Sequence, residues 1–284
     1  MSLEKIAGML SRLCESAATL AKVAVRSRRP SPGVRRDASS EVVILGNGPG
    51  LRDAIDNHME FLMGRERMAV NFAANAPEFR VLVPSFYVLA DPHFFDGGND
   101  ANVDLLWRNL RSVEHDMTLY VPCVRYKQAC EAVRPSARVR VKTFNLTPSE
   151  GCDCLSHILY DAGLAMPRPR NVLIPSIMTA MREGFKTIYI AGADHTWSRT
   201  LGVDEHNRVV SVQPHFYKDS DSEQKRVNTE YEGYHLHDIL YSLYVAFRSY
   251  HKIEAYAVCR GVRIINITPG SMIDAFCRKS LDSL

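Results

Sequence analysis

Residues 195–237 form a polar segment that has no sustained helical or strand periodicity but is rich in histidine and tyrosine. Imidazole groups titrate near neutral pH and can take a proton from an attacking hydroxyl, while tyrosine hydroxyls can donate hydrogen bonds to a departing phosphate. A loop of about forty residues in a compact domain is more often a functional lid than a structureless connection. The segment is therefore predicted to be a lid that carries chemistry. Its aromatic and imidazole residues include His195, Trp197, His206, His215, Tyr217, Tyr231, Tyr234, His235 and His237.

A glycine-rich turn, GNGPG at residues 46–50, follows the apolar run EVVIL and precedes a helical pattern. Its spacing differs from the GxGxxG of dinucleotide folds, and it lacks the Lys-Ser/Thr of a P-loop. Gly48 and Gly50 would let a ligand approach the backbone, amides at a helix start favour an anion, and Asn47 offers a donor and an acceptor. The turn is predicted to hold a nucleotide's phosphate or sugar. The simpler alternative is a tight turn in which glycine permits positive φ.

Polar residues also follow two later apolar runs. Asp194 ends the run KTIYIAGAD and could position a ligand or orient a neighbouring histidine. Thr268 and Ser271 follow VRIINI, where a short helix is expected to begin. They are either a helix N-cap or a second nucleotide contact. Trp197 is either a packing residue or a platform for a sugar ring.

Strand-like and helical patterns alternate along residues 41–284. This alternation predicts an α/β fold, with a Rossmann-like, mostly parallel sheet, helices on both of its faces and a lid-like insertion at about 195–237. The expected strands are 41–45, 67–72, 86–91, 117–122, 138–144, 186–194 and 262–267, and the expected helices are 51–63, 101–112, 124–133, 153–163, 173–183 and 238–258. Ligands bind such sheets at the carboxyl ends of strands, near the point where the strand order reverses. Chemistry is therefore expected at 46–50, 91–95 and 192–197.

Residues 1–40 are predicted to be an amphipathic, basic arm and linker, separate from the nucleotide-binding domain of residues 41–284. Eight basic and three acidic residues give this arm a net charge of +5. Its basic end follows its apolar stretch, which reverses the order found in a signal peptide. The arm is expected either to contact an anionic membrane through residues 1–36 or to pack on the body or a partner chain. Its apolar stripe, at steps of three and four, comprises Leu3, Ile6, Leu10, Leu13, Ala17 and Leu20.

The composition of the rest of the chain excludes several classes of protein. Because the whole chain carries +3, the part after residue 40 carries −2, which argues against a general nucleic-acid-binding protein. The seven cysteines form no CxxC pair, so a zinc site is not indicated. No apolar run approaches the length of a bilayer span. We expect a reduced, cytoplasmic protein with peripheral contact at the inner face of the cell membrane.

Several stretches together resemble two related families. One is the bacterial lipooligosaccharide sialyltransferases, which have a GNGPS turn, an asparagine after the second strand and an NPxxFF-like stretch after the third. The other is the 6-hydroxymethylpterin diphosphokinase family (MptE-like, DUF115-type), with a similar nucleotide-binding core and a DP pair at the third strand. The likeness covers roughly residues 41–275 without 97–170, and it is more specific for fold than for substrate. The matching stretches are GNGPG, Asn71, DPHFF at 91–95, GFKTIYIAGAD at 184–194 and NITPGSMIDAF at 266–276.

The sialyltransferase resemblance implies a nucleotide site. CMP would be held by Asn71 and by the first turn, which means Gly46, Asn47, Gly48 and Pro49. The serine that usually ends this turn is Gly50 in this chain, so one hydroxyl contact is lost. Asp91 replaces a second asparagine. A carboxylate there could accept from ribose hydroxyls or bind Mg²⁺, but it would repel a diphosphate unless a cation intervened.

The same resemblance implies catalytic residues. That family uses a histidine base just before the long helix, and His237 matches this position best, with His235 as the second choice. It also uses two lid tyrosines to stabilise the leaving phosphate, and Tyr217 and Tyr231 are the candidates here.

These features predict an inverting glycosyltransferase. It would transfer a nucleotide-activated sugar, with CMP-linked sialic acid or a Kdo-like sugar as the expected donor, to a glycan or glycolipid acceptor at the cell surface. No cofactor is expected, although Mg²⁺ would be needed if Asp91 and Asp194 were metal ligands. The alternatives are an MptE-like diphosphokinase that uses ATP and Mg²⁺, and a non-catalytic nucleotide-binding protein. The sequence does not indicate an oligomeric state.

Overall fold

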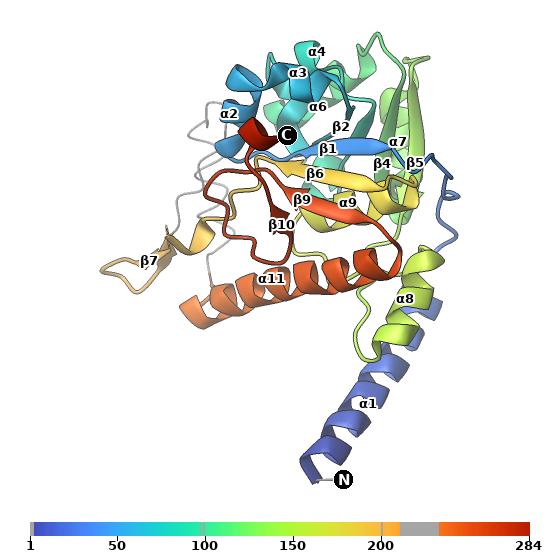
Figure 1. Cartoon of the computed structure of the whole chain (residues 1–284), viewed down its shortest axis with the longest axis vertical. Helices are drawn as coiled ribbons and strands as arrows, with labels where there is room; N and C mark the ends of the chain where they lie inside the picture. The colour runs from blue at the N-terminus through green and yellow to red at the C-terminus, as the bar shows by residue number, and fades with distance from the viewer. Residues whose placement is uncertain (1–2, 97, 99, 200, 211–232) are drawn as a thin grey trace.

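A sheet of eight parallel strands forms the centre of the protein (Figure 1). The computed structural model describes residues 3–96, 98, 100–199, 201–210 and 233–284. The fold is α/β and Rossmann-like, as predicted. In spatial order the strands are β10 (Cys277–Arg278), β9 (Arg263–Asn266), β6 (Thr187–Ala191), β1 (Glu41–Leu45), β2 (Glu66–Val70), β3 (Phe86–Val88), β4 (Met117–Pro122) and β5 (Val139–Phe144).

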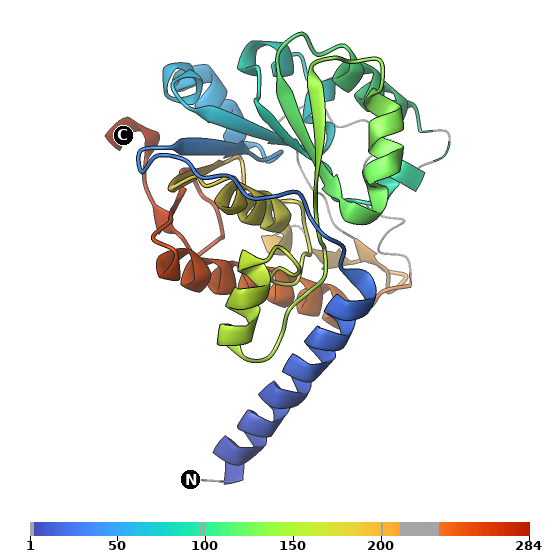
Figure 2. The same ribbon diagram turned by 90° about the vertical axis from the view of Figure 1, so that its right-hand side faces the viewer.

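Helices cover both faces of this sheet (Figures 1 and 2). A small antiparallel hairpin, β7 (Gly202–Val203) with β8 (Val209–Val210), extends from the body. The α-helices of the described residues are α1 (Leu3–Arg26), α2 (Gly50–Asn57), α3 (Met59–Met63), α4 (Phe79–Leu82), α5 (His93–Asp96), α6 (Ala101–Arg111), α7 (Tyr126–Val133), α8 (Asp153–Asp161), α9 (Leu173–Arg182) and α11 (Leu236–Cys259).

Strand β1 shows why helices lie on both faces. Val42 and Ile44 belong to the core cluster that includes residues of α9 and α11, whereas Val43 and Leu45 belong to the cluster that includes residues of α2 and α3. Successive side chains of a strand point to opposite faces. An unbroken apolar run therefore serves two helical layers, as is typical of buried parallel strands.

The strand order reverses at β1. The chain runs from β1 to β5 in one direction along the sheet and then crosses back, so that β6 lies on the other side of β1. Leu45, the last residue of β1, is opposite Ala69 in β2 and Ala191 in β6. Connections leave the carboxyl ends of β1 and β6 in opposite directions, which creates the crevice where ligands bind in folds of this kind.

Some predicted boundaries differ from the observed ones. The helix predicted at 51–63 is divided into α2 and α3, because the backbone of His58 (φ −134°, ψ 33°) leaves the helical region. Strand β2 ends at Val70, and the next residue begins a 3₁₀ turn, η1 (Asn71–Asn75). The prediction of a short helix after Thr268 is wrong: a turn and an extended segment lead into β10.

The N-terminal arm forms the predicted helix and projects from the body (Figures 1 and 2). Only Ser16 and Thr19 are buried among its described side chains. The linker that follows is tied down: Val34 donates its N–H to the carbonyl of Arg182, and the Arg36 side chain donates to the carbonyl of Glu183. In the described part of the chain, no helix is both long enough and apolar enough to cross a membrane.

Candidate functional site

A cavity of about 580 Å³ lies at the carboxyl ends of β1, β2, β3 and β6. Small-molecule sites in proteins usually measure about 300–1,000 Å³. The cavity therefore has the size and the place expected of a ligand site at the reversal of strand order. Its wall also includes the segment 169–173, which leads into α9, and Ile239, Ser242 and Leu243 from the first turns of α11.

The structure brings together seven of the predicted site residues and leaves others outside. Those that line the cavity are Gly46, Asn47, Gly48, Pro49, Asn71, Asp91 and Asp194. Those in the described part of the chain that do not line it are Gly50, Thr268, Ser271, His235 and His237. Tyr217 and Tyr231 lie outside the described residues.

The glycines of the GNGPG turn bring it against the loop that follows β6. Gly46 donates its N–H to the carbonyl of Ala191, and Gly48 donates to the carbonyl of Gly192, each at 2.8 Å. A Cβ atom at Gly48 would lie 2.0 Å from Oδ2 of Asp194 and 2.8 Å from the carbonyl oxygen of Gly192. The glycines are thus required by contact with the protein's own backbone, and the amides of Gly46 and Gly48 are already used.

Asp194 occupies the position of an anion at the start of α2. Both of its carboxylate oxygens accept the N–H of Gly50, at 3.1 Å. Burial raises the pKa of Asp194, and the N–H groups of Gly50 and of Asp194 itself oppose this shift. The helix terminus that was expected to receive a ligand phosphate therefore receives this carboxylate.

Thr268 and Ser271 hold the loop after β6 from behind the cavity wall. The N–H of Ala193 donates to Oγ1 of Thr268 at 3.0 Å, and Oγ of Ser271 donates to the carbonyl of Ala193 at 2.7 Å. Both side chains are buried. Their hydroxyls thus position Asp194 indirectly.

Asn71 and Asp91 sit at the ends of neighbouring strands. Asn71 has a left-handed backbone (φ 51°), which asparagine tolerates better than most residues, and its carbonyl accepts the hydroxyl of Tyr87. Asp91 is exposed at the rim of the cavity, and its carboxylate accepts the N–H of His93 at 2.8 Å. Both residues are held by the protein in positions where they can reach a bound molecule.

Two side-chain amide atoms in the cavity wall are buried without a partner. Oδ1 of Asn47 and Nδ2 of Asn171 have no hydrogen bond from any described residue. A buried polar group without a partner is unfavourable by about 1–3 kcal/mol. These two amide groups, from distant segments of the chain, are therefore available to a polar ligand in the cavity.

Charged side chains are few in the described wall. Arg170 is the one Lys or Arg side chain among the lining residues, against two carboxylates, Asp91 and Asp194. Across the described residues, no group of three His, Cys, Asp or Glu side chains is arranged to hold a metal ion. The wall so described offers hydrogen bonds rather than strong positive charge.

His235 and His237 lie at the start of α11. His235 caps this helix in a capping box with Asp238, whose carboxylate accepts the N–H of His235 at 3.0 Å. The side chain of His237 is 80% exposed, and its Nε2 lies 3.4 Å from Asp238. Ile239, two residues later, lines the cavity. Both imidazoles are therefore near the end of the helix that borders the cavity, but outside its wall.

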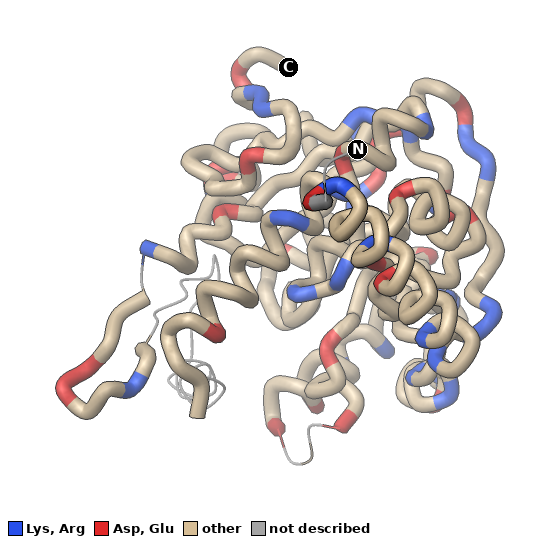
Figure 3. The backbone as a smooth tube through the Cα atoms, turned by 90° about the horizontal axis from the view of Figure 1, so that it is seen from below, with Lys and Arg blue, Asp and Glu red and all other residues tan. Residues whose placement is uncertain are grey.

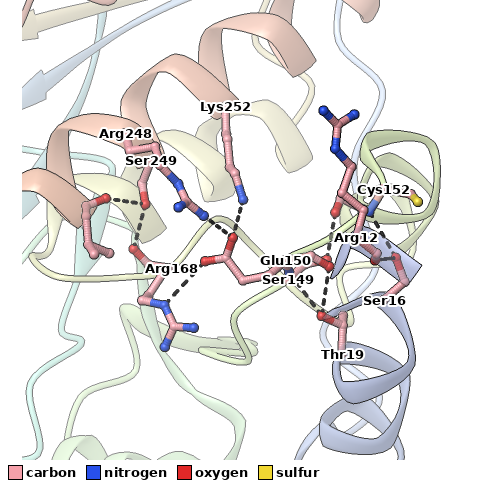
Figure 4. A network of polar contacts seen from close by, with 12 residues as sticks. Arg12, Ser16, Thr19, Ser149, Glu150, Cys152, Arg168, Arg248, Ser249 and Lys252 are labelled. Atoms are coloured by element: carbon pink, nitrogen blue, oxygen red, sulfur yellow. Dashed lines mark hydrogen bonds and ion pairs between the residues drawn. The ribbon is translucent and has the colours of Figure 1, made fainter. Parts of the chain in front are cut away.

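A partly buried carboxylate, Glu150, ties two parts of the cavity wall to the N-terminal helix (Figure 4). It forms ion pairs with Arg168, Arg248 and Lys252. Arg168 precedes the lining segment 169–173, and the other two belong to α11. The backbone of Glu150 exchanges two hydrogen bonds with the hydroxyl of Thr19 in α1, each at 3.0 Å. One residue thus fixes the relative positions of three segments.

His195 and Asn171 are among the cavity residues that the sequence does not mark as site residues. The sequence presents His195 only as one histidine of a polar segment, and a lone asparagine before a helix, such as Asn171, is typical of an ordinary turn or cap. His195 has a left-handed backbone (φ 52°), a conformation that concentrates at functional sites in residues other than glycine.

No protein-family model matches the chain, and no curated protein matches it. One solved structure that is similar is a MAf glycosyltransferase from Magnetospirillum magneticum AMB-1, with a TM-score of 0.48 and 14% sequence identity. The match covers 94% of this chain and 38% of that protein, so the chain spans well under half of its length.

Proposed function

We propose that the protein is a glycosyltransferase that takes a CMP-linked acidic sugar, of the sialic acid or Kdo type, as its donor. The observation that carries this proposal is the coincidence of a 580 Å³ cavity with the residues that the sequence marks as nucleotide contacts. Asn47, Asn71 and Asp91 reach that cavity from three adjacent strands. The sialyltransferase-like motifs contribute the choice of CMP.

The charge of the cavity wall favours a monophosphate over a triphosphate. ATP would bring several negative charges toward Asp91 and Asp194, with Arg170 as the one Lys or Arg side chain of the described wall. Such a site would depend on Mg²⁺. A CMP-linked acidic sugar carries one charge on its phosphate and one on its carboxylate, which is fewer than ATP carries. Its repulsion from the same carboxylates is therefore weaker, and a few hydrogen-bond donors can satisfy its phosphate.

In the proposed reaction, the acceptor hydroxyl oxygen attacks the anomeric carbon while the bond from that carbon to the phosphate oxygen breaks. CMP leaves with the bonding electrons, and the configuration at the carbon inverts. We assign the acceptor's proton to His237, with His235 as the alternative, because both stand exposed beside the end of α11 that borders the cavity. Tyr217 and Tyr231 are proposed to stabilise the leaving phosphate.

The proposed acceptor is a glycan or glycolipid made at the inner face of the cell membrane, and α1 is proposed to contact that membrane. The large apolar residues described in its stripe are exposed, with Leu10 56% and Leu13 51% accessible. Seen from below, Lys and Arg residues gather near the end of α1 that is away from the N-terminus (Figure 3). An exposed apolar stripe with basic residues beside it is typical of helices that lie on anionic bilayers.

The proposed function is tested first by thermal stabilisation with CMP, CDP, UDP, GDP and ATP, each with and without Mg²⁺. A ligand that binds only the native state raises stability by mass action, by about 2.7 kcal/mol at a hundred times its Kd. We expect stabilisation by CMP without metal and a much smaller effect in the variant Asn47→Ala.

Other outcomes of this screen favour other functions. Stabilisation by ATP that requires Mg²⁺ would replace the glycosyltransferase with the diphosphokinase, and Asp91 would then become a metal ligand. Stabilisation by CMP, without transfer or hydrolysis of a CMP-sugar, would favour a non-catalytic nucleotide-binding protein.

A further inference from the structure

Three side chains form a hydrogen-bonded chain beside the cavity. Nε2 of His195 lies 2.6 Å from the hydroxyl oxygen of Tyr250, and that hydroxyl donates to Oδ1 of Asn171 at 3.0 Å. Asn171 and His195 line the cavity, whereas Tyr250 lies fully buried behind them. The chain joins three distant segments: the loop before α9, the loop after β6 and the middle of α11.

The direction of each hydrogen bond follows from the donors present. Oδ1 of Asn171 also accepts the N–H of Leu173 at 3.0 Å, which fixes the orientation of the amide and leaves Nδ2 as its free donor. Since Tyr250 gives its one proton to Asn171, it must accept from His195. His195 therefore carries its proton on Nε2, and Nδ1 is an unprotonated acceptor.

Aromatic residues surround this histidine. Trp197 lies at 4.1 Å from His195 between ring centroids, and Tyr250 and Phe247 lie at 5.5 and 6.4 Å. Burial among them lowers the pKa of His195 to about 3, so its ring is neutral at physiological pH. This part of the wall thus combines a neutral acceptor, a neutral donor and the aromatic surface of Trp197, which lines the cavity too.

The position of this wall along the sheet separates it from the predicted nucleotide residues. Asn71 and Asp91 follow β2 and β3, whereas His195 follows β6, on the other side of β1. Adjacent strands lie about 4.8 Å apart, so the distance from β6 to β3 is about 14 Å. That length accommodates a nucleotide at one end of the cavity and a sugar ring at the other.

We propose that Asn171, His195 and Trp197 form the subsite for the sugar of the donor, and that Tyr250 is the positioning residue that orients the two polar groups. This inference rests on the proposed function. Neutral donors and acceptors beside an aromatic surface suit the hydroxyls and the apolar face of a pyranose ring. The unpaired Nδ2 of Asn171 would donate to a sugar oxygen, and Nδ1 of His195 would accept from a sugar hydroxyl.

The hydrogen-bond chain can be tested without any ligand, by ¹⁵N NMR of the histidine side chains. We expect His195 in the Nε2–H form, and unprotonated at pH 5, in the wild-type protein. The variant Tyr250→Phe should lose the fixed tautomer while remaining folded. A His195 ring that titrates near pH 6.5, or that carries its proton on Nδ1, would contradict the hydrogen bonds proposed among His195, Tyr250 and Asn171.

The sugar subsite is tested by comparing binding of CMP with binding of CMP-N-acetylneuraminate. Tyr250→Phe should weaken binding of the sugar nucleotide by about tenfold, equivalent to about 1.4 kcal/mol, and should change CMP binding less than twofold. The matched control is Tyr256→Phe, because Tyr256 lies on the same helix and donates to Asp161, and neither of these residues lines the cavity. This control should leave both affinities unchanged.

The outcomes separate the subsite from the proposed function. If Tyr250→Phe weakened binding of both ligands equally, the nucleotide would lie at this wall; the sugar subsite would be wrong, but nucleotide binding would stand. Unchanged affinity for both ligands would also contradict the sugar subsite. If neither compound bound the wild-type protein, the proposed function and the sugar subsite would fail together, while the histidine tautomer would still decide the hydrogen-bond chain.

Discussion

The carboxylate of Asp194 occupies the space that a side chain at Gly48 would need. Oδ2 of Asp194 lies 2.0 Å from the position of a Cβ at Gly48, and the same carboxylate accepts the N–H of Gly50. The two loops that border the reversal of strand order are thus packed against each other, and the shape of the cavity depends on that packing.

Replacing Gly48 with alanine should therefore destabilise the protein. We expect a loss of about 1–3 kcal/mol, as for other overpacked sites, measured by urea denaturation. Gly8, in α1, is the matched control, since a Cβ there meets no atom within 4 Å. Gly8→Ala should leave stability unchanged or raise it by up to about 1 kcal/mol. Equal stability of Gly48→Ala and wild type would contradict the observed contact.

Asp194→Asn should stabilise the protein at neutral pH. Burial raises the pKa of Asp194, so the folded state favours the neutral carboxyl more than the unfolded state does. The stability that protonated Asp194 contributes is present at low pH and is lost as the pH rises through its pKa in the folded protein. Asparagine keeps an acceptor for Gly50 without the charge, and we expect a gain below about 1 kcal/mol at pH 7. A variant less stable than wild type at pH 7 would show that the charge itself stabilises α2.

Glu150→Gln should weaken the connection between α1, the segment 169–173 and α11. Burial opposes ionisation of Glu150, but Lys252, Arg248 and Arg168 outweigh it and lower its pKa from the usual 4.5. The stability that ionised Glu150 contributes is present above pH 4.5 and is lost as the pH falls through its pKa in the folded protein.

The variant should therefore lose roughly 1–3 kcal/mol at pH 7, and the difference from wild type should shrink on acidification below pH 4.5. The exposed Glu131 of α7 gives the control Glu131→Gln, which should have little effect. A difference that stays constant with pH would assign the loss to shape rather than to charge.

The apolar stripe of α1 should be required for binding to anionic vesicles. Placing glutamates at Leu10 and Leu13 should reduce co-sedimentation with phosphatidylglycerol vesicles more than tenfold. Two leucines that would insert into the bilayer are lost, and the new negative charges are repelled by the headgroups. Ser11→Glu, on the polar side of the same helix, is the control. Binding of the wild type should weaken as salt is raised. If the wild-type protein did not bind such vesicles, the membrane contact would be wrong, and the exposed stripe of α1 would be assigned to contact with a protein partner.

His237→Ala should impair transfer without affecting nucleotide binding. Loss of a general base lowers kcat by about 10²- to 10⁴-fold. CMP should bind as it does to the wild type, since His237 is outside the described cavity wall. The assay is transfer from CMP-N-acetylneuraminate to a lactose-terminated acceptor. Unchanged turnover would exclude His237 as the base, and His235 would be the next variant to make.

The fold was predictable from the sequence because buried parallel strands are simple patterns. EVVIL became β1 with its predicted bounds, and the glycine-rich turn was correctly expected after it. What was not predictable was the use of that turn. Whether the amide of Gly48 meets a phosphate or the carbonyl of Gly192 depends on contacts between segments far apart in the sequence, which no local pattern reports. Asn171 escaped notice for the same reason, because its importance comes from partners on α11.

The pairing of β1 with β6 also has a consequence for how the protein folds. Glu41 pairs with Thr187, although strands β2 to β5 lie between them in the chain. Pairings between distant segments form slowly, because the entropy cost of closing a long loop comes before any stabilising contact forms. A chain in which only β1 to β5 had assembled would have one wall of the cavity without the other. Ligand binding should therefore appear late during refolding, together with the last native contacts, and its kinetics would report when the two halves of the sheet join.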